Sequence, residues 1–217
     1  MVAERLAAEG AVVAGAERSQ EALDSLAADL GLPPERWDGH AVDLLDEDAT
    51  RAWCAALVER FGRVDGLLHL VGGWRGGEPL HEAPLEDWAL LHDLLVRTLQ
   101  HTTRAFHDQL LAGEHGRFVL VSAKQAQNPT NTNAAYATAK AAAEAWTLAF
   151  ADGFEPGGAT ANILVVGAIL TPRMREENPG KDFPTFTPAE DIAAAIAYLC
   201  SDAAEKMNGQ RLALTMK

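Results

Sequence analysis

The chain has few of the residues that build metal centres or bind polyanions. Its two cysteines, Cys54 and Cys200, lie far apart, and its seven histidines form neither a cluster nor a His-x-x-x-His pair. This distribution predicts no metal site and is typical of a reduced, cytoplasmic protein. Basic residues are also scarce. With 18 Lys and Arg against 31 Asp and Glu, the net charge of −13 argues against nucleic acid as a partner.

Long apolar runs are absent as well. No run is long enough to cross a membrane, and the first residues lack the basic-then-apolar pattern of a signal peptide. Hydrophobic residues make up 48% of the 217 residues, which is enough for the core of one domain. We therefore expect a single domain over residues 1–217 that binds a small molecule and no membrane.

What the chain does contain is a regular alternation of apolar strands and amphipathic helices. Strands are expected at 11–16, 40–44, 64–71, 117–121, 161–166 and 211–215, and helices at 19–30, 46–61, 85–111, 133–151 and 188–199. This order predicts an α/β protein with a Rossmann-like, doubly wound parallel sheet covered on both faces. Such sheets bind ligands beyond the carboxyl ends of their strands, where Gly72, Ser122 and Thr171 fall.

Two residues with acid–base chemistry share one expected helix. Tyr136 and Lys140 are four positions apart and so lie on the same helix face. A nearby cation lowers the pKa of a phenol from about 10, which would make Tyr136 a proton donor or acceptor near neutral pH. Ser122, fourteen positions upstream, could hold a substrate carbonyl. A half-buried tyrosine and a solvated lysine on an alanine-rich helix would give the same pattern.

Tyr136-x-x-x-Lys140 with the upstream Ser122 resembles the short-chain dehydrogenase/reductase family, and the resemblance runs from Ala3 to Leu214. It implies an NAD(P)-dependent oxidoreductase that transfers hydride to or from a small carbonyl or alcohol. Tyr136 would be the acid or base, Lys140 would lower its pKa and hold the ribose, and Ser122 would orient the substrate. The resemblance also implies a homodimer or homotetramer.

The same resemblance assigns the cofactor contacts. They are Glu17, Arg18, Asp43, Leu44, Val71, Gly72, Gly73, Tyr136, Lys140, Gly167, Ile169 and Thr171. Glu17 would accept hydrogen bonds from the adenosine ribose hydroxyls, which favours NAD, whereas Arg18 could bind the phosphate of NADP. The cofactor is thus NAD or NADP, with NAD slightly favoured. Thr171 would bond the nicotinamide carboxamide.

Three departures from the family stand out. His69 replaces the first Asn of the usual Asn-Asn-Ala-Gly stretch. Leu95 falls where many members have an Asn that links the lysine through water to solvent, so proton supply must take another route or be slower. The opening strand and its glycine-rich turn are missing, because residues 1–11 resemble the end of the first helix and the turn after it.

The absent strand would lie between the strands expected at 11–16 and 64–71. Two hypotheses follow: either the true start lies upstream, or the chain is a natural short form with impaired cofactor binding. The upstream codons would decide between them.

A narrower resemblance concerns the segment 72–77, Gly-Gly-Trp-Arg-Gly-Gly. It is similar to a Gly-Gly-Trp-x-Gly-Gly segment of the dihydropteridine reductase branch, and Ala123-Lys124 is similar to an Ala-Lys pair there. Trp74 could then stack on a flat heterocycle, although a surface-packing anchor is equally consistent. The alternatives are a dihydropteridine reductase-like enzyme and a catalytically silent homologue that binds a ligand or its own kind.

Overall fold

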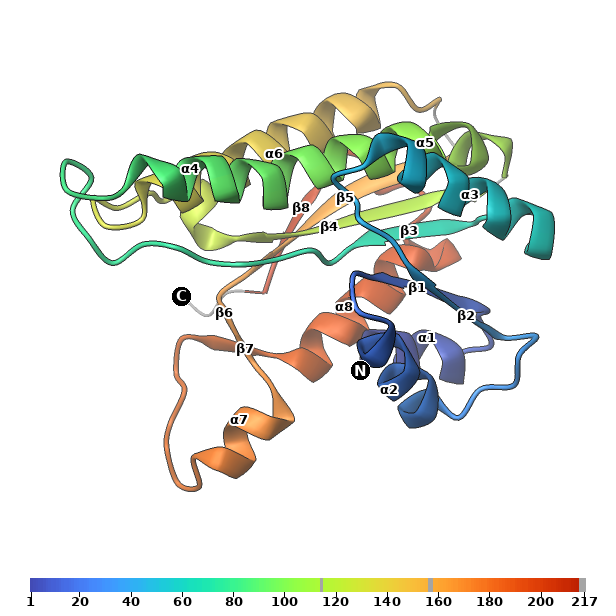
Figure 1. Cartoon of the computed structure of the whole chain (residues 1–217), viewed down its shortest axis with the longest axis horizontal. Helices are drawn as coiled ribbons and strands as arrows, with labels where there is room; N and C mark the ends of the chain where they lie inside the picture. The colour runs from blue at the N-terminus through green and yellow to red at the C-terminus, as the bar shows by residue number, and fades with distance from the viewer. Residues whose placement is uncertain (114, 156–157, 215–217) are drawn as a thin grey trace.

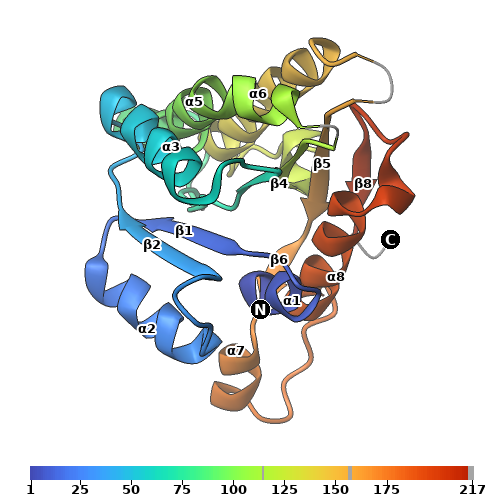
Figure 2. The ribbon, with the colours of Figure 1, turned by 90° about the vertical axis from the view of Figure 1, so that its right-hand side faces the viewer.

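The computed structural model describes residues 1–113, 115–155 and 158–214. Helices cover both faces of parallel β-structure, with α3 to α6 on one side and α1, α2 and α8 on the other (Figures 1 and 2). The strands are β1 (Val13–Glu17), β2 (Trp37–Ala41), β3 (Gly66–His69), β4 (Arg117–Ala123), β5 (Thr160–Val166), β6 (Ala168–Leu170), β7 (Phe186–Pro188) and β8 (Arg211–Ala213). The α-helices are α1 (Val2–Ala8), α2 (Gln20–Leu30), α3 (Glu47–Phe61), α4 (Leu85–His92), α5 (Thr98–Ala112), α6 (Ala134–Asp152), α7 (Pro172–Glu177) and α8 (Ala189–Cys200).

Among the described residues all strand pairs are parallel, and they form three sheets. One sheet has the order β3-β4-β5-β8, and β1-β2 and β6-β7 form two-stranded sheets. This arrangement confirms the predicted Rossmann-like α/β class. Within the described ranges β1 pairs only with β2 and β3 only with β4. The strand expected between them stays a prediction, and the structure leaves one edge of β1 and one edge of β3 open to such a strand.

Local signals placed most helix ends correctly. The Ser19 and Asp46 side chains cap α2 and α3 by accepting hydrogen bonds from the backbone N–H three residues on. Gly31 and Gly62 end these helices with φ of 56° and 81°, in the left-handed region that glycine adopts without a Cβ clash.

The strand predicted at 40–44 is wrong by three residues, since β2 covers Trp37–Ala41. Its register is set by small residues rather than by apolar ones. Gly15 lies opposite Gly39, and the Trp37 indole occupies the space above them. A Cβ on Gly15 would come 2.8 Å from Cη2 of that ring. The predicted end of the last strand, residue 215, lies outside the described residues.

The helix predicted over 85–111 is interrupted by a π-helical segment, Asp93–Arg97. The wider turn includes Leu95, which is 2% exposed and packs with Leu91, Val96 and Ala139. The Thr98 hydroxyl donates to the carbonyl of Leu94 at 2.7 Å, which satisfies a backbone group at the point of irregularity. Segments of this kind often lie at functional sites.

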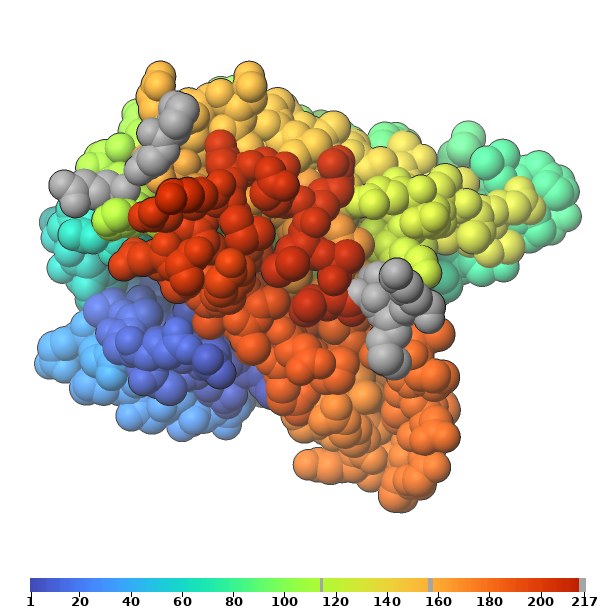
Figure 3. All heavy atoms as spheres, turned by 180° about the vertical axis from the view of Figure 1, so that it is seen from behind, coloured from blue at the N-terminus to red at the C-terminus, as the bar shows by residue number. Residues whose placement is uncertain are grey.

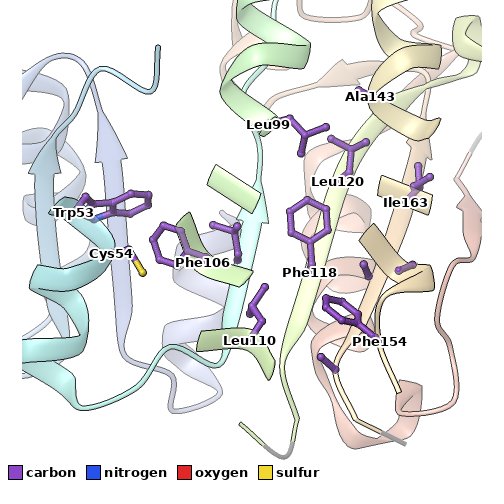
Figure 4. Close-up of a cluster of buried hydrophobic side chains, with 14 of the residues drawn as sticks. Trp53, Cys54, Leu99, Phe106, Leu110, Phe118, Leu120, Ala143, Phe154 and Ile163 are labelled. Atoms are coloured by element: carbon purple, nitrogen blue, oxygen red, sulfur yellow. The ribbon is translucent and has the colours of Figure 1, made fainter. Parts of the chain in front are cut away.

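The main core lies between the sheets and the helices α3, α5 and α6. Figure 4 shows Trp53 of α3 pointing toward Phe106 of α5, with ring centroids 4.9 Å apart, and Phe118 and Ile163 on the adjacent strands. Through these contacts the β1-β2 part and the larger sheet share one core, although they share no strand pairing.

Residues 168–188 form a projecting unit that the sequence did not predict (Figures 1 and 3). It contains β6, α7 and β7, and β6 pairs with β7. The signal for α7 was present, because Thr171 caps the helix and Pro172 occupies its first turn.

Candidate active site

Tyr136 and Lys140 lie in α6, as the helix prediction required, one turn apart. Tyr136 is half-buried against an apolar cluster of Leu91, Leu95 and Ala139. Burial raises the pKa of Tyr136 above its ordinary value of 10, which is opposite to the predicted direction. The prediction counted the nearby charge and left out the low-polarity surroundings, which favour the neutral phenol.

Lys140 is almost fully enclosed, with 5% of its surface exposed. Its Nζ donates a hydrogen bond to the carbonyl oxygen of Val121 in β4, at 2.9 Å. Burial lowers the pKa of Lys140 to about 8, and the charge of Glu144 acts in the opposite sense. A lysine with such a pKa exchanges its charge within the physiological range, which is unusual for this residue type and typical of functional lysines.

The Ser122 side chain forms a hydrogen bond with another residue of the chain. The side chain is 1% exposed, and its hydroxyl donates to Oε1 of Glu144 at 2.7 Å. The strand β4 ends at Ala123, two residues beyond the predicted limit of 121. The structure therefore gives the Ser122 hydroxyl a bond within the chain, and its predicted role in orienting a substrate gains no support from this geometry.

Sequence reasoning assigned no role to Glu144, and it named His69 only as the replacement of a family Asn. Glu144 follows Lys140 by four positions in an otherwise alanine-rich helix, and this spacing was a usable signal. His69 ends β3 and is 3% exposed. Its Nε2 and Nδ1 each lie 3.3 Å from a threonine hydroxyl, those of Thr98 and Thr102 respectively.

Burial lowers the pKa of His69 to about 3, and the positive charge of Lys140 adds to the effect. His69 is thus a neutral imidazole at neutral pH, with one ring nitrogen as donor and the other as acceptor. Thr98 directly follows the π-helical segment, so the irregular turn and the buried histidine form one feature.

The residues expected to hold the adenosine end lie at two strand ends. Glu17 ends β1, is exposed, and accepts a hydrogen bond from the backbone N–H of Arg18 at 2.7 Å. Asp43 follows β2 and its Oδ1 accepts from the N–H of Leu45 at 3.0 Å, which fixes the turn after the strand. Leu44 is half-buried in the same turn.

The residues expected near the pyrophosphate and the nicotinamide follow β3 and β5. Val71 is half-buried, and the backbone at Gly72 and Gly73 is exposed. After β5, Ile169 is 43% exposed, and the hydroxyl of Thr171 accepts from the N–H of Met174 at 3.2 Å.

Gly167 lies at the start of this second segment. A Cβ there would come 2.4 Å from the carbonyl oxygen of Thr185, so the close approach of the two segments requires glycine. Exposed acidic and backbone groups at the carboxyl ends of parallel strands fit a dinucleotide.

This fold and this arrangement of residues define an oxidoreductase class, and the chain belongs to the short-chain dehydrogenase/reductase family. The family model described as Enoyl-(Acyl carrier protein) reductase matches residues 1–215.

Two curated relatives are similar over most of their length. The 3-oxoacyl-(acyl-carrier-protein) reductase of Thermotoga maritima is 28% identical over 94% of this chain and 86% of the relative. The D-threitol dehydrogenase of Mycolicibacterium smegmatis is 27% identical over 98% of this chain and 85% of the relative.

Solved structures agree with this assignment. A short chain dehydrogenase from Burkholderia cenocepacia, solved in complex with NADP, superposes with a TM-score of 0.82 at 28% identity, over 98% of this chain and 89% of that one. The fold alone is also similar to that of NAD+-bound xylitol dehydrogenase, with a TM-score of 0.85 at 23% identity, over 99% of this chain and 92% of that one.

Among the described residues, no helix has the length and apolar character to cross a membrane. Over the same ranges, no three or more His, Cys, Asp or Glu side chains are grouped so as to hold a metal ion.

Proposed function

We propose that the chain is an NAD(P)-dependent oxidoreductase that transfers a hydride to or from a small carbonyl or alcohol, with Tyr136 as the acid or base. The observation that carries this proposal is the pair of Tyr136 and Lys140 on one face of α6, with Lys140 bonded to Val121 near the carboxyl end of β4. A carboxyl end of a parallel strand is the expected ligand site in such sheets. Membership of the family supports the same activity.

The chain's own residues would supply the proton and the positioning. When bound, the nicotinamide group supplies or accepts the hydride. Tyr136, whose pKa is raised by burial, holds its proton at neutral pH, as a general acid in carbonyl reduction requires. In the reverse direction the phenolate must form, and the Lys140 ammonium would stabilise it. Thr171 would hold the carboxamide and Glu17 the adenosine ribose.

Fluorescence titration of the chain with NADH and NADPH tests the cofactor part of this proposal. We expect saturable binding with NADH preferred, because the exposed Glu17 carboxylate can accept from ribose hydroxyls and repels a 2′-phosphate. Glu17→Gln is expected to weaken NADH binding by about 10- to 100-fold and to abolish the preference, since a hydrogen bond to a charged group contributes roughly 1.5–3 kcal/mol. Glu21→Gln removes the same charge from the nearby helix α2 and should leave the preference unchanged.

Two other results would have different meanings. A preference for NADPH that disappears in Arg18→Gln would mean that Arg18 sets the cofactor preference by binding the phosphate of NADP. No binding by a folded chain would favour the catalytically silent homologue, unless the same titration succeeds with a chain extended before Met1 by a strand able to pair with β1 and β3.

A flat heterocycle is a second candidate substrate, and two observations favour it. Trp74 is 55% exposed and borders a pocket of about 250 Å³ that Arg75, Glu78 and Asp87 also line. The loop that carries Trp74 is anchored, because the N–H of Gly77 donates to the carbonyl of Thr132 at 2.8 Å.

Trp74→Ala separates the two substrate classes. Aromatic stacking contributes about 0.5–1.5 kcal/mol beyond buried area, so KM for a dihydropterin should rise about three- to tenfold. KM for a small aliphatic ketone should change less than twofold. Trp88→Ala is the matched control, since Trp88 is 38% exposed on the neighbouring helix α4 and does not line the pocket. An equal rise for both substrates would indicate that Trp74 supports the loop rather than a heterocycle.

A further inference from the structure

A buried carboxylate lies one helical turn after Lys140 in α6. Glu144, on the same face of α6 as both, is 2% exposed. Three side chains donate to it: the Ser122 hydroxyl at 2.7 Å, the Gln127 amide at 3.2 Å and Nε of Arg211 at 2.7 Å. A buried carboxylate is costly unless its lone pairs are satisfied, and these contacts come from β4, the turn after it and β8.

We propose that Glu144 is a positioning residue that keeps Lys140 charged and in place. In the same proposal, the hydrogen bond to Glu144 occupies the Ser122 hydroxyl, so that this hydroxyl does not bind the substrate. The proposal rests on the proposed function, because Glu144 would support the catalytic role that this function gives to Lys140. In this role Glu144 would act through Lys140 and Ser122 and not by contact with substrate or cofactor.

The geometry connects Glu144 to Lys140 in two ways. The first runs through the backbone of β4. The carbonyl of Val121 accepts the Lys140 hydrogen bond at 2.9 Å, and the next residue, Ser122, is hydrogen-bonded to Glu144. The carboxylate therefore fixes the strand end that receives the ammonium. The second is electrostatic, because the negative charge of Glu144 favours the ammonium form that burial disfavours.

Few other charged groups bear on Lys140. From β3 comes His69, which is neutral above pH of about 3. From α6 itself come Tyr136, whose phenol is neutral, and Glu144. From β8 comes Arg211, which pairs with Glu144 and is partly exposed. The packing partners from α4 and the π-helical segment are apolar. Glu144 is thus the negative charge that acts on the lysine from the surrounding described elements.

Glu144→Gln tests this role, because glutamine keeps the size and the acceptor for Ser122 while it removes the charge. We expect the basic limb of the pH–rate profile for carbonyl reduction to move to lower pH by about one unit, since the lysine loses its proton earlier. Arg211→Gln leaves the carboxylate charged and should not move the limb downward. A lower rate or melting temperature with the limb in place would overturn the proposal and leave Glu144 a structural residue.

A measurement that does not need turnover keeps this test independent of the proposed function. The titration of Lys140 can be followed by NMR of lysine side chains labelled with carbon-13, with its signal assigned by loss in Lys140→Met. In Glu144→Gln the Lys140 midpoint should fall by about one unit. An unmoved midpoint refutes the inference, whereas a shifted midpoint in a chain that reduces no carbonyl would refute only the proposed function.

Ser122→Ala tests the second half of the proposal. If Glu144 holds the hydroxyl away from the substrate, kcat/KM should fall by less than about tenfold, which corresponds to one lost hydrogen bond. A hydroxyl that contacts the reacting carbonyl would instead give a loss of about 10²–10³-fold. A loss of that larger size in a variant with unchanged melting temperature would place Ser122 in the catalytic machinery and overturn this half.

Discussion

Tyr136→Phe is expected to lower kcat for carbonyl reduction by about 10²–10⁴-fold, the range that positioned general acids supply. The change removes one oxygen atom and with it the proton that the product oxygen needs. The ring itself packs against Leu91, Leu95 and Ala139, and phenylalanine keeps these contacts. We therefore expect the far-ultraviolet circular dichroism and the melting temperature to change little while turnover is lost.

The chain offers a close control for this experiment. Its second tyrosine, Tyr198, lies in α8 and is 44% exposed. Tyr198→Phe makes the same chemical change away from the candidate site and should leave kcat within about twofold, because exposed substitutions have small effects. Unchanged turnover in Tyr136→Phe would refute the acid–base role and leave the family resemblance without its mechanism.

The parts of the structure that the sequence predicted are those set by neighbours in the chain. The bounds expected for the helices at 19–30 and 46–61 depend on residues within one helical turn, and so does the shared face of Tyr136 and Lys140. Strand and helix alternation likewise depends on local periodicity. These features were therefore readable before the fold was known.

The parts that the sequence did not predict depend on distant residues. Ser122 meets Glu144 across 22 positions, and His69 meets Thr98 across 29, so neither contact has a local signal. The direction of the Tyr136 pKa was wrong for the same reason, because burial is a property of the assembled fold. The register of β2 was also missed, since it follows from the space between Gly15 and Gly39 that the Trp37 ring fills.

Acid conditions are expected to lower the free energy of unfolding through His69. Between pH 7 and pH 4.5 this loss should be smaller by about 2–3 kcal/mol in His69→Asn than in the wild type. Burial lowers the pKa of His69 from 6.5 to about 3 in the folded chain. Between these two values the unfolded chain binds a proton that the folded chain does not, so the free energy of unfolding falls as the pH falls through this window. Each unit of pH within it costs about 1.4 kcal/mol.

Urea unfolding of the wild type and of His69→Asn at the two pH values provides the measurement. The quantity of interest is the change in unfolding free energy between the pH values, because any constant cost of the substitution cancels. Asparagine can still exchange a hydrogen bond with the Thr98 hydroxyl but does not titrate. His81→Asn is the matched control, since the His81 side chain is 74% exposed and should leave the pH dependence unchanged.

The same experiment tests the connection between His69 and the candidate site. The charge of Lys140 is the second cause of the low His69 pKa, after burial. Lys140→Met should therefore recover a smaller part of the acid loss than His69→Asn does, because it removes the repulsion and leaves the burial. Equal pH dependence in the wild type and in His69→Asn would contradict the prediction. It would mean that the folded chain protonates His69 between the Thr98 and Thr102 hydroxyls, and that Lys140 has a cation beside it at acid pH.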